Sequence, residues 1–370
     1  MLDDIFFVLF APDGAVCGII FLREVESMVG QNIRYWRLRR DMTRAGLSRK
    51  SGLPARLIAA YENCDENPDM QKLTVLANAL DVSVLDFLTE RNDSVSFSHG
   101  EFRKISGLTK NRQEYVQAAI EEYFGRFYTA MELMSDNTLP KAPKTHVLPF
   151  SGNIENAALA MRFYVGVPLS GPIGSLVELV ESLGILVCFL DLDGQKTDSF
   201  SGENGEVNGR PYIAVNRAMQ GARNRATIAH ELAHILFSWP NTMSEKEIER
   251  NATAIAGAFL FPADDVRKVF PVYGNYKWEI LENIGAEFGV SAQLVVKRAA
   301  VVGVVSKVDE TQFFKSVSSH KWRKQEPSRV PQEESILLEE FVQNALRAGE
   351  ISVSRGAELL GVPLAKLISK

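Results

Sequence analysis

Apolar residues recur along most of this chain at the three- and four-residue spacing of amphipathic helices, in short segments that end at glycine, proline or asparagine. Between Val29 and Leu88 this pattern predicts four or five short helices. Thr43 is placed to cap one helix, Gly52 ends it, and Pro54 suits the first turn of the next. Two short helices joined by a glycine-containing turn form a layout typical of DNA-binding domains.

Beyond Leu88 the pattern becomes a mixture of helices and strands. A long helix is expected at 111–134, followed by helices at 154–164 and 173–183. Apolar runs predict strands at 185–190 and 211–215, with a polar, glycine-rich loop at 191–209 between them. The next expected elements are a helix around 226–237, a helix that begins with acidic residues and ends near Pro262, and a helical region at 276–305. A polar connector with Lys307, Lys315, Lys321 and Lys324 follows, and two helices are expected at 333–348 and 353–360.

These elements predict a multidomain, mainly α protein. At 370 residues the chain is too long for one compact domain of ordinary size. The expected parts are an N-terminal five-helix helix-turn-helix domain at 29–90, a helical linker at 91–145, an α+β domain with a small sheet at 146–305, and a C-terminal helical region at 306–370 that ends in a helical hairpin.

Residues 1–28 precede the first predicted domain and contain two apolar runs, separated by Pro12 and Gly14. Asp3 and Asp4 stand where a signal peptide carries positive charge, and the apolar stretch is too broken to span a membrane. The segment is either a hairpin-like appendage or an extension from a start codon assigned too early, with Met28 as the natural start. We favour the second interpretation.

Composition and charge narrow the class of protein. Apolar and charged contents of 46% and 24% are typical of a globular protein, and a net charge of −5 excludes a uniformly basic nucleic-acid binder. Cys17, Cys64 and Cys188 are scattered, and their spacing matches neither a metal-binding motif nor a disulfide framework, so we expect a reducing, cytoplasmic location.

A basic cluster lies between residues 34 and 56, where Asp41 is the only acid, and it indicates a face that contacts phosphates. Its members are Arg34, Arg37, Arg39, Arg40, Arg44, Arg49, Lys50 and Arg56.

The strongest chemical signal is the stretch His230-Glu231-Leu232-Ala233-His234. On a helix, residues four apart share a face, so both imidazoles can bind one zinc ion. Glu231 then lies beside the remaining coordination position, where its carboxylate can take a proton from water. The apolar flanks favour a buried helix under a metal site over a surface helix with two solvated histidines.

The first predicted domain carries a set of apolar, polar and turn residues that together resemble the Xre family of helix-turn-helix regulators. These residues are Ile33, Arg34, Arg37, Met42, Thr43, Leu47, Gly52, Leu53, Ile58, Glu62, Asn63, Pro68, Leu73, Leu76, Ala77, Leu80, Val82 and Leu88. The resemblance implies that Ala55, Arg56 and Ala60 face base edges in the major groove of double-stranded DNA. Among these, only Arg56 is a strong direct reader of bases.

The same resemblance implies that Arg44 and Asn63 contact phosphates, and we expect Arg37 to contact DNA as part of this basic surface. The chain departs from the family at Arg44, where glutamine is usual, and at Cys64, where glycine is usual. Single helix-turn-helix units read paired half-sites, so a homodimer is expected.

The middle of the chain, from about Ile154 to Val305, resembles the ImmA/IrrE family of zinc metallopeptidases. The matching stretches are Ala160-Met161-Arg162, Gly166-Val167-Pro168, Gly184-Ile185, Ile213-Ala214-Val215-Asn216, the run from Arg225 to His234, Glu249-Arg250-Asn251-Ala252, Phe259-Leu260-Phe261-Pro262, and Phe288-Gly289-Val290-Ser291 with Arg298 and Gly303. The resemblance implies a zincin-like fold, a Zn²⁺ cofactor and hydrolysis of a peptide bond in a protein substrate.

The resemblance also implies that Glu249 is the third zinc ligand, beside His230 and His234. Glu245 and Glu247 are its rivals, and Glu249 is preferred because Ala252, Ala256 and Phe259 then place it on the buried side of its helix. Glu231 is the expected proton acceptor. A group that stabilises the oxyanion is also expected, and Tyr212 and His146 are only candidates for it.

The leading hypothesis is a DNA-bound transcriptional regulator that carries its own protease and cuts a repressor. The alternative is a non-proteolytic repressor or antitoxin-like regulator whose peptidase-like domain senses a ligand or binds a partner. An intact Glu231 favours the protease hypothesis, because a domain that only binds a ligand or partner has no need of this carboxylate.

The C-terminal stretch at 346–363 has a second helix-turn-helix-like pattern, although a helical hairpin that caps the peptidase domain is the favoured interpretation.

Overall fold

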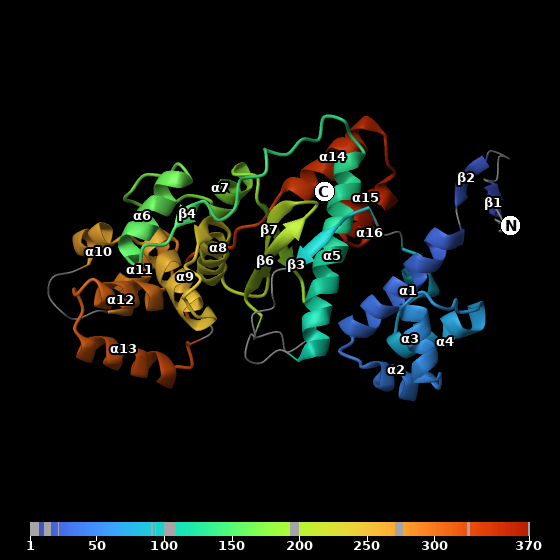
Figure 1. The fold of residues 1–370 in the computed structure, drawn as a ribbon, viewed down its shortest axis with the longest axis horizontal. Coiled ribbons are helices and arrows are strands. Elements are labelled where there is room, and N and C mark those ends of the chain that lie inside the picture. The colour runs from blue at the N-terminus through green and yellow to red at the C-terminus, as the bar shows by residue number, and fades with distance from the viewer. Residues whose placement is uncertain are drawn as a thin grey trace. The chain divides into compact units, whose positions relative to one another are not determined.

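The computed structural model describes residues 7–10, 16–20, 22–89, 92, 94–99, 109–192, 200–270, 277–323 and 326–368. The described chain is mainly helical and separates into two compact units (Figure 1). The first unit contains residues 1–94 and 106–128, and the second contains 95–105, 129–192 and 198–370. The prediction of a mainly α, multidomain fold with a small sheet in the middle is confirmed.

The first unit is a small helical domain with a hairpin before it. Its elements are β1 (Phe7–Phe10), β2 (Val16–Ile20), α1 (Leu22–Arg39), α2 (Arg44–Ser51), α3 (Ala55–Glu62), α4 (Met70–Leu80), the 3₁₀ helix η1 (Val84–Phe87), and α5 (Lys110–Glu132) as far as Tyr128. β1 and β2 pair antiparallel, and α1 begins ahead of Val29, inside the segment interpreted as an extension. The core of the unit is formed by residues that include Ile33, Leu47, Ile58, Leu76 and Phe87.

Local signals set the ends of these helices as the sequence predicted. The Thr43 hydroxyl accepts a hydrogen bond from the Gly46 N–H at 3.0 Å, and Gly52 ends α2 with a left-handed φ of 76°. Cys64, just after α3, also has a left-handed φ, of 61°. Only glycine adopts this conformation without a steric cost, which explains why the family prefers glycine where this chain has Cys64.

The sheet of the second unit has the strand order β3-β6-β7-β5. Its strands are β3 (Phe97–His99), β5 (Leu186–Leu190), β6 (Gly202–Val207) and β7 (Arg210–Asn216). β5 and β7 run parallel, and the other pairs are antiparallel. A second, two-stranded sheet joins β4 (Leu148–Pro149) in parallel to β8 (Phe237–Ser238).

The remaining elements of this unit are helices, of which α7 contacts β5 and α8 contacts β6 and β7. They are α6 (Ile154–Tyr164), α7 (Leu176–Ser182), α8 (Gly221–Leu236), α9 (Glu245–Leu260), α10 (Ala263–Val269), α11 (Trp278–Phe288), α12 (Ala292–Val301), α13 (Lys307–Ser319), α14 (Leu337–Ala348), α15 (Val353–Leu360) and α16 (Leu364–Ile368). One hydrophobic core unites the unit. It contains residues of the helices α6, α7, α8, α9, α11 and α12, and it contains Val187 and Phe189 of β5 and Ile213 and Val215 of β7. Since side chains alternate along a strand, these four define the inner face of the sheet.

Strand β6 lies inside the segment that the sequence analysis interpreted as a polar loop, and this interpretation is wrong. Its residues read Gly-Glu-Asn-Gly-Glu-Val, with no alternating apolar face to indicate a strand. Two glycines instead let neighbours approach closely: a Cβ at Gly202 would lie 2.5 Å from the Thr227 side chain, and one at Gly205 would lie 2.6 Å from the Tyr212 hydroxyl. Pairing with both β3 and β7 supplies the hydrogen bonds that a polar loop lacks.

The expected polar connector after Val305 is also wrong over its first half, because α13 occupies residues 307–319. Ser306 caps this helix by accepting from the Asp309 N–H at 3.1 Å, and Phe313 stacks on Trp278. Lys324 lies outside the described residues. In the expected C-terminal hairpin, Gly349 ends α14 with a φ of 76° and the Ser352 hydroxyl caps α15, so that the two helices pack together.

Buried arginines link the segments around α9. The Arg162 side chain is fully buried and donates to the carbonyl oxygens of Phe259, Pro168 and Gly171 at 2.6–2.8 Å. Its burial lowers its pKa to about 10, although the neighbouring charge of Asp265 favours the ionised form. Since these three hydrogen bonds all go to carbonyl oxygens, Arg162 serves to join the loops at Pro168 and Gly171 to α9.

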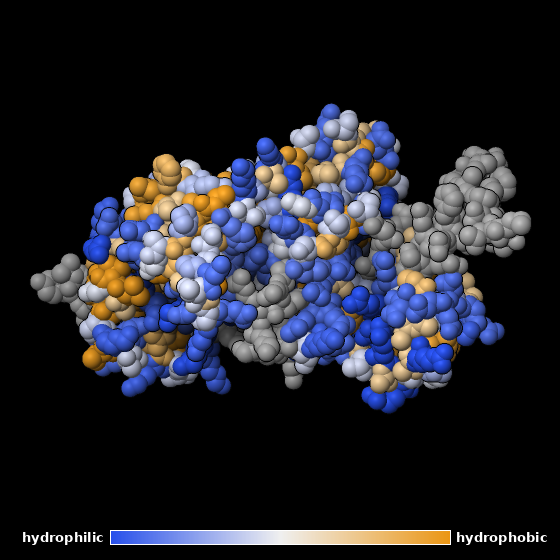
Figure 2. All heavy atoms as spheres, viewed as in Figure 1, coloured by the Kyte–Doolittle hydropathy of each residue, from blue (hydrophilic) through white to orange (hydrophobic). Residues whose placement is uncertain are grey.

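The exposed surface on the face shown in Figure 2 is mainly hydrophilic, with apolar patches over the second unit. Leu159 and Phe163 on α6 are among the exposed apolar side chains. Within the described part of the chain, no helix combines the length and apolar character needed to cross a bilayer.

Glu181 on α7 makes the stability of the second unit depend on pH. Its side chain is buried, and desolvation raises its pKa to about 7 from 4.5. The carboxyl group therefore stabilises the fold while protonated, and this contribution is lost as the pH rises through 7. We expect the free energy of unfolding to fall by about 3 kcal/mol more in the wild type than in Glu181→Gln between pH 5 and 8.

Urea titrations followed by tryptophan fluorescence test this, because the second unit holds Trp239, Trp278 and Trp322. Glu206→Gln, which removes an exposed carboxylate from β6, is the matched control and is expected to retain the wild-type profile. Parallel pH profiles for the wild type and Glu181→Gln would contradict the assignment.

Candidate metal centre and nucleic-acid interface

The expected metal ligands lie where α8 packs against α9. α8 presents His230 and His234 one turn apart, and Glu249 stands in the second turn of α9. Both helices bury small residues, which allow close approach: Ala229, Ala233, Ala252, Ala256, Gly257 and Ala258. The packing of these two helices therefore brings together residues that lie far apart in the sequence.

The geometry of the three side chains fits a tetrahedral zinc ion. The Nε2 atoms of His230 and His234 are 3.1 Å apart. The carboxylate oxygens of Glu249 lie 3.3 Å from His230 Nε2 and 3.1 Å from His234 Nε2. Ligands about 2.0–2.1 Å from a tetrahedral zinc ion are separated from each other by about 3.3 Å. Two imidazole nitrogens and a carboxylate also form a donor set of catalytic zinc sites.

Thr253, on α9, orients one of the two imidazoles. Its hydroxyl donates to the carbonyl oxygen of Glu249 at 2.9 Å, so it is free to accept a hydrogen bond from His230 Nδ1, at 3.2 Å. A proton on Nδ1 leaves a lone pair on Nε2, which is the atom that faces the other two donors. Thr253 was not identified from the sequence, although its spacing of four residues from Glu249 places both on one side of α9.

Glu231 is buried, with 7% of its surface exposed. Its Oε2 accepts a hydrogen bond from Asn204 Nδ2 at 2.6 Å. Asn204 lies on β6 opposite Ile213, so its side chain points from the inner face of the sheet towards α8. Asn204 was not identified from the sequence because β6 was interpreted as a loop.

Glu247 and Glu245, the two alternatives to Glu249 as the third metal ligand, do not face the imidazoles. The Glu247 carboxylate accepts from the backbone N–H and the hydroxyl of Ser244, at 2.9 and 2.6 Å, in a capping box that lowers its pKa. Glu245 is exposed in the first turn of α9. Of the three acids, the structure brings Glu249 to the imidazoles.

The two candidates for oxyanion stabilisation differ in their position. The Tyr212 hydroxyl lies 3.0 Å from His99 Nδ1 and 3.3 Å from Glu203 Oε1. Tyr212 and Glu203 point from the outer face of the sheet, away from Asn204, so Tyr212 is not placed for this role. His146 is held beside the end of α8, with Nδ1 3.0 Å from the carbonyl oxygen of Phe237, and its role stays a prediction.

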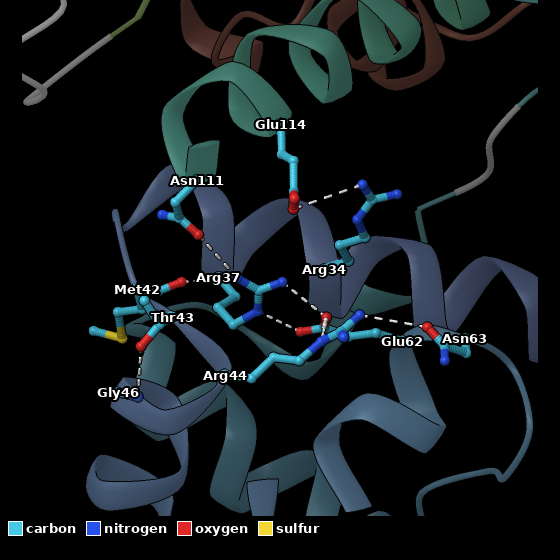
Figure 3. A network of polar contacts seen from close by, with 10 residues as sticks. All are labelled: Arg34, Arg37, Met42, Thr43, Arg44, Gly46, Glu62, Asn63, Asn111 and Glu114. Carbon is cyan, nitrogen blue, oxygen red and sulfur yellow. Dashed lines mark hydrogen bonds and ion pairs between the residues drawn. The ribbon is translucent and has the colours of Figure 1, made fainter. Parts of the chain in front are cut away.

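In the first unit, α2 and α3 carry the residues expected to contact DNA. Arg56 is exposed near the start of α3, and Ala55 and Ala60 are partly exposed on the same helix. The Arg44 side chain is 42% exposed at the start of α2 and pairs with Glu62 at 2.8 Å. Asn63 is exposed at the end of α3, with its Oδ1 3.4 Å from Arg44 (Figure 3).

Arg37 corrects one sequence prediction. Its side chain is only 3% exposed, and it pairs with the fully buried Glu62 carboxylate through both Nε and Nη2 (Figure 3). Its Nη1 also donates to the carbonyl oxygen of Met42 at 2.8 Å. A guanidinium enclosed in this way cannot reach a DNA phosphate, so the prediction that Arg37 contacts DNA is wrong. Arg37 instead joins α1 to α3 and to the turn before α2.

Comparison with protein families supports both parts of this description. The helix-turn-helix family model matches residues 33–87, and the Peptidase_M78 model, described as the IrrE N-terminal-like domain, matches residues 180–300. A comparison with curated proteins finds no match. The chain thus combines a helix-turn-helix domain of Xre type with an IrrE-like domain of a peptidase family.

The buried pair of Arg37 and Glu62 generates a prediction about stability. We expect Arg37→Met to lower the free energy of unfolding of the first unit by about 3–5 kcal/mol, because Glu62 loses the partner that compensates its burial. Arg56→Met, which removes an exposed guanidinium, is the control and should change it by less than about 0.5 kcal/mol. Trp36 is the tryptophan of this unit and reports its urea transition. Equal stabilities of the two variants would contradict the structural role of Arg37.

Proposed function

We propose that this protein is a DNA-binding transcriptional regulator whose second unit is a zinc endopeptidase acting on a protein, with a repressor as the favoured substrate. The observation that carries the proposal is the set of three metal-binding atoms, 3.1–3.3 Å apart, beside the buried carboxylate of Glu231. The matches to a helix-turn-helix family and to an IrrE-like peptidase family support the two halves of the proposal.

In the proposed reaction His230, His234 and Glu249 hold the zinc ion. When bound, Zn²⁺ supplies a Lewis acid that polarises the scissile carbonyl group and makes water a better nucleophile. Glu231 accepts the proton of the attacking water and passes it to the leaving amine. Asn204 holds Glu231 Oε2 through its amide N–H, which keeps the other carboxylate oxygen available to move the proton.

For DNA, we propose that α3 enters the major groove and that Arg56 contacts base edges there, flanked by Ala55 and Ala60. Arg44 and Asn63, at the start of α2 and the end of α3, contact backbone phosphates. A homodimer would place two such units on paired half-sites. The exposure of Arg56, Arg44 and Asn63 supports this arrangement.

The metal centre is tested by zinc content and by cleavage. Purified without chelators, the wild type should contain one zinc ion per chain, and Glu249→Gln or His230→Ala should lose it. Glu231→Gln should keep the zinc and cleave a repressor substrate, identified by testing the products of neighbouring genes against the wild type, about 10²- to 10⁴-fold more slowly, because its side chain cannot accept a proton. Elemental analysis and gel assays measure the two quantities.

Two outcomes would overturn parts of this proposal. A wild-type protein without zinc would remove the hydrolytic mechanism. If Glu231→Gln retained zinc and left regulation in cells unchanged, the second unit would act as a sensor or binding domain instead of a protease.

The contact between Asn204 and Glu231 gives a separate prediction. Asn204→Ala should keep its zinc but lower kcat about 10- to 100-fold, because the carboxylate loses the hydrogen bond that orients it. Asn156→Ala, at an exposed position of α6, is the control. Steady-state kinetics separate kcat from KM, and a rise in KM alone would show that Asn204 binds substrate instead of orienting Glu231.

A further inference from the structure

A hollow of about 600 Å³ opens in the first unit between α1, the start of α2, the end of α3 and the first turns of α5 (Figure 3). Its lining is almost entirely polar. The lining residues are Arg34, Arg37, Thr43, Arg44, Ala45, Glu62, Asn63, Asn111 and Glu114. Two of them, Arg44 and Asn63, are the residues proposed above to contact DNA phosphates.

The charges in this hollow are unequally paired. Arg37 and Glu62 neutralise each other in the buried floor, where Glu62 also accepts from Arg44. Arg34 has a much weaker partner, because its Nη2 lies 3.9 Å from Glu114 Oε2, beyond hydrogen-bond distance. The Arg34 and Glu114 side chains are 42% and 32% exposed, so water competes with their attraction. Three cations and two anions leave a net positive charge that faces the opening.

The linker helix α5 holds Glu114 at this position. Asn111 Nδ2 donates to Asp41 Oδ1 at 3.3 Å, and Arg112 pairs with Asp41 Oδ2 at 3.1 Å. Arg37 Nη1 also lies 3.4 Å from Asn111 Oδ1. These contacts attach the first turn of α5 to the helix-turn-helix domain, and Glu114 follows one turn later on the same side.

We propose that this hollow binds one backbone phosphate of duplex DNA through Arg34 and Arg44, and that Glu114 is an internal competitor which the phosphate displaces. Guanidinium groups bind phosphate oxygens in pairs of parallel hydrogen bonds, which the Glu114 carboxylate does not form with Arg34 at 3.9 Å. The inference rests on the proposed DNA binding and adds Arg34 and Glu114 to it. The carboxylate of α5 thereby lowers the affinity of the domain for DNA.

Two substitutions test this because they break the same pair with opposite expected effects. Arg34→Gln removes a phosphate ligand, so binding should weaken about 5- to 10-fold and the slope of log affinity against log salt should fall by about one. Glu114→Gln removes the competitor, so binding should tighten about 3- to 5-fold at low salt. If the pair only supported the fold, both substitutions would shift affinity in the same direction.

The measurement is fluorescence anisotropy of the full chain with a labelled duplex from the region upstream of its own gene, at several salt concentrations. An unrelated duplex of equal length serves as the second probe. Glu121→Gln is the matched control, because Glu121 lies two turns further along α5 and outside the hollow, and it removes the same charge. Its affinity should equal that of the wild type, and a gain equal to that of Glu114→Gln would show a general charge effect and overturn the proposal.

The failure of this inference can be distinguished from that of the proposed function. If the wild type binds neither duplex in a salt-dependent way, DNA binding itself is contradicted. If the wild type binds DNA and Arg34→Gln and Glu114→Gln leave its affinity unchanged, the phosphate site is contradicted alone. Circular dichroism melting establishes that each variant is folded before its affinity is compared.

Discussion

The close packing of α8 against α9 is the constraint on which the candidate metal centre depends. Small residues along both helices let the carboxylate of Glu249 come within 3.1–3.3 Å of two imidazole nitrogens. The far end of α9 is held by two buried arginines, because Arg162 of α6 donates to the carbonyl oxygen of Phe259 and Arg298 of α12 to that of Phe261. Helices α6 and α12 therefore help to fix the position of α9 within the second unit.

Each unit contains a buried glutamate near its functional surface, and their partners give the two glutamates different roles. Glu62 is surrounded by the guanidinium groups of Arg37 and Arg44, which neutralise its charge and fix its position. Among the described residues, Glu231 receives a hydrogen bond from the neutral amide of Asn204. The Glu62 carboxylate is thus engaged by two cations, whereas the hydrogen bond to Glu231 comes from an uncharged group and reaches Oε2. These surroundings give Glu62 a structural role and are consistent with the proposed role of Glu231 as a proton acceptor.

The sequence predicted those parts of the fold and site that depend on local patterns. The helix-turn-helix caps at Thr43 and Gly52 and the spacing of His230 and His234 all follow from residues close together in the chain. Strand β6 could not be predicted in this way, since its polar sequence forms a strand only through pairing with β3 and β7. Its contribution to the site, Asn204, was missed for the same reason. Arg37 was misinterpreted because a count of basic residues does not reveal which of them is buried against an acid.

Thr253 gives the candidate metal centre a property that His230, His234 and Glu249 alone would lack. One helix, α9, supplies both the carboxylate of Glu249 and the hydroxyl that sets the orientation of His230. Any displacement of α9 from α8 would remove one donor and, in the same movement, release the ring of a second. We therefore expect a separation of α8 from α9 to disturb two of the three donors of this candidate site at once.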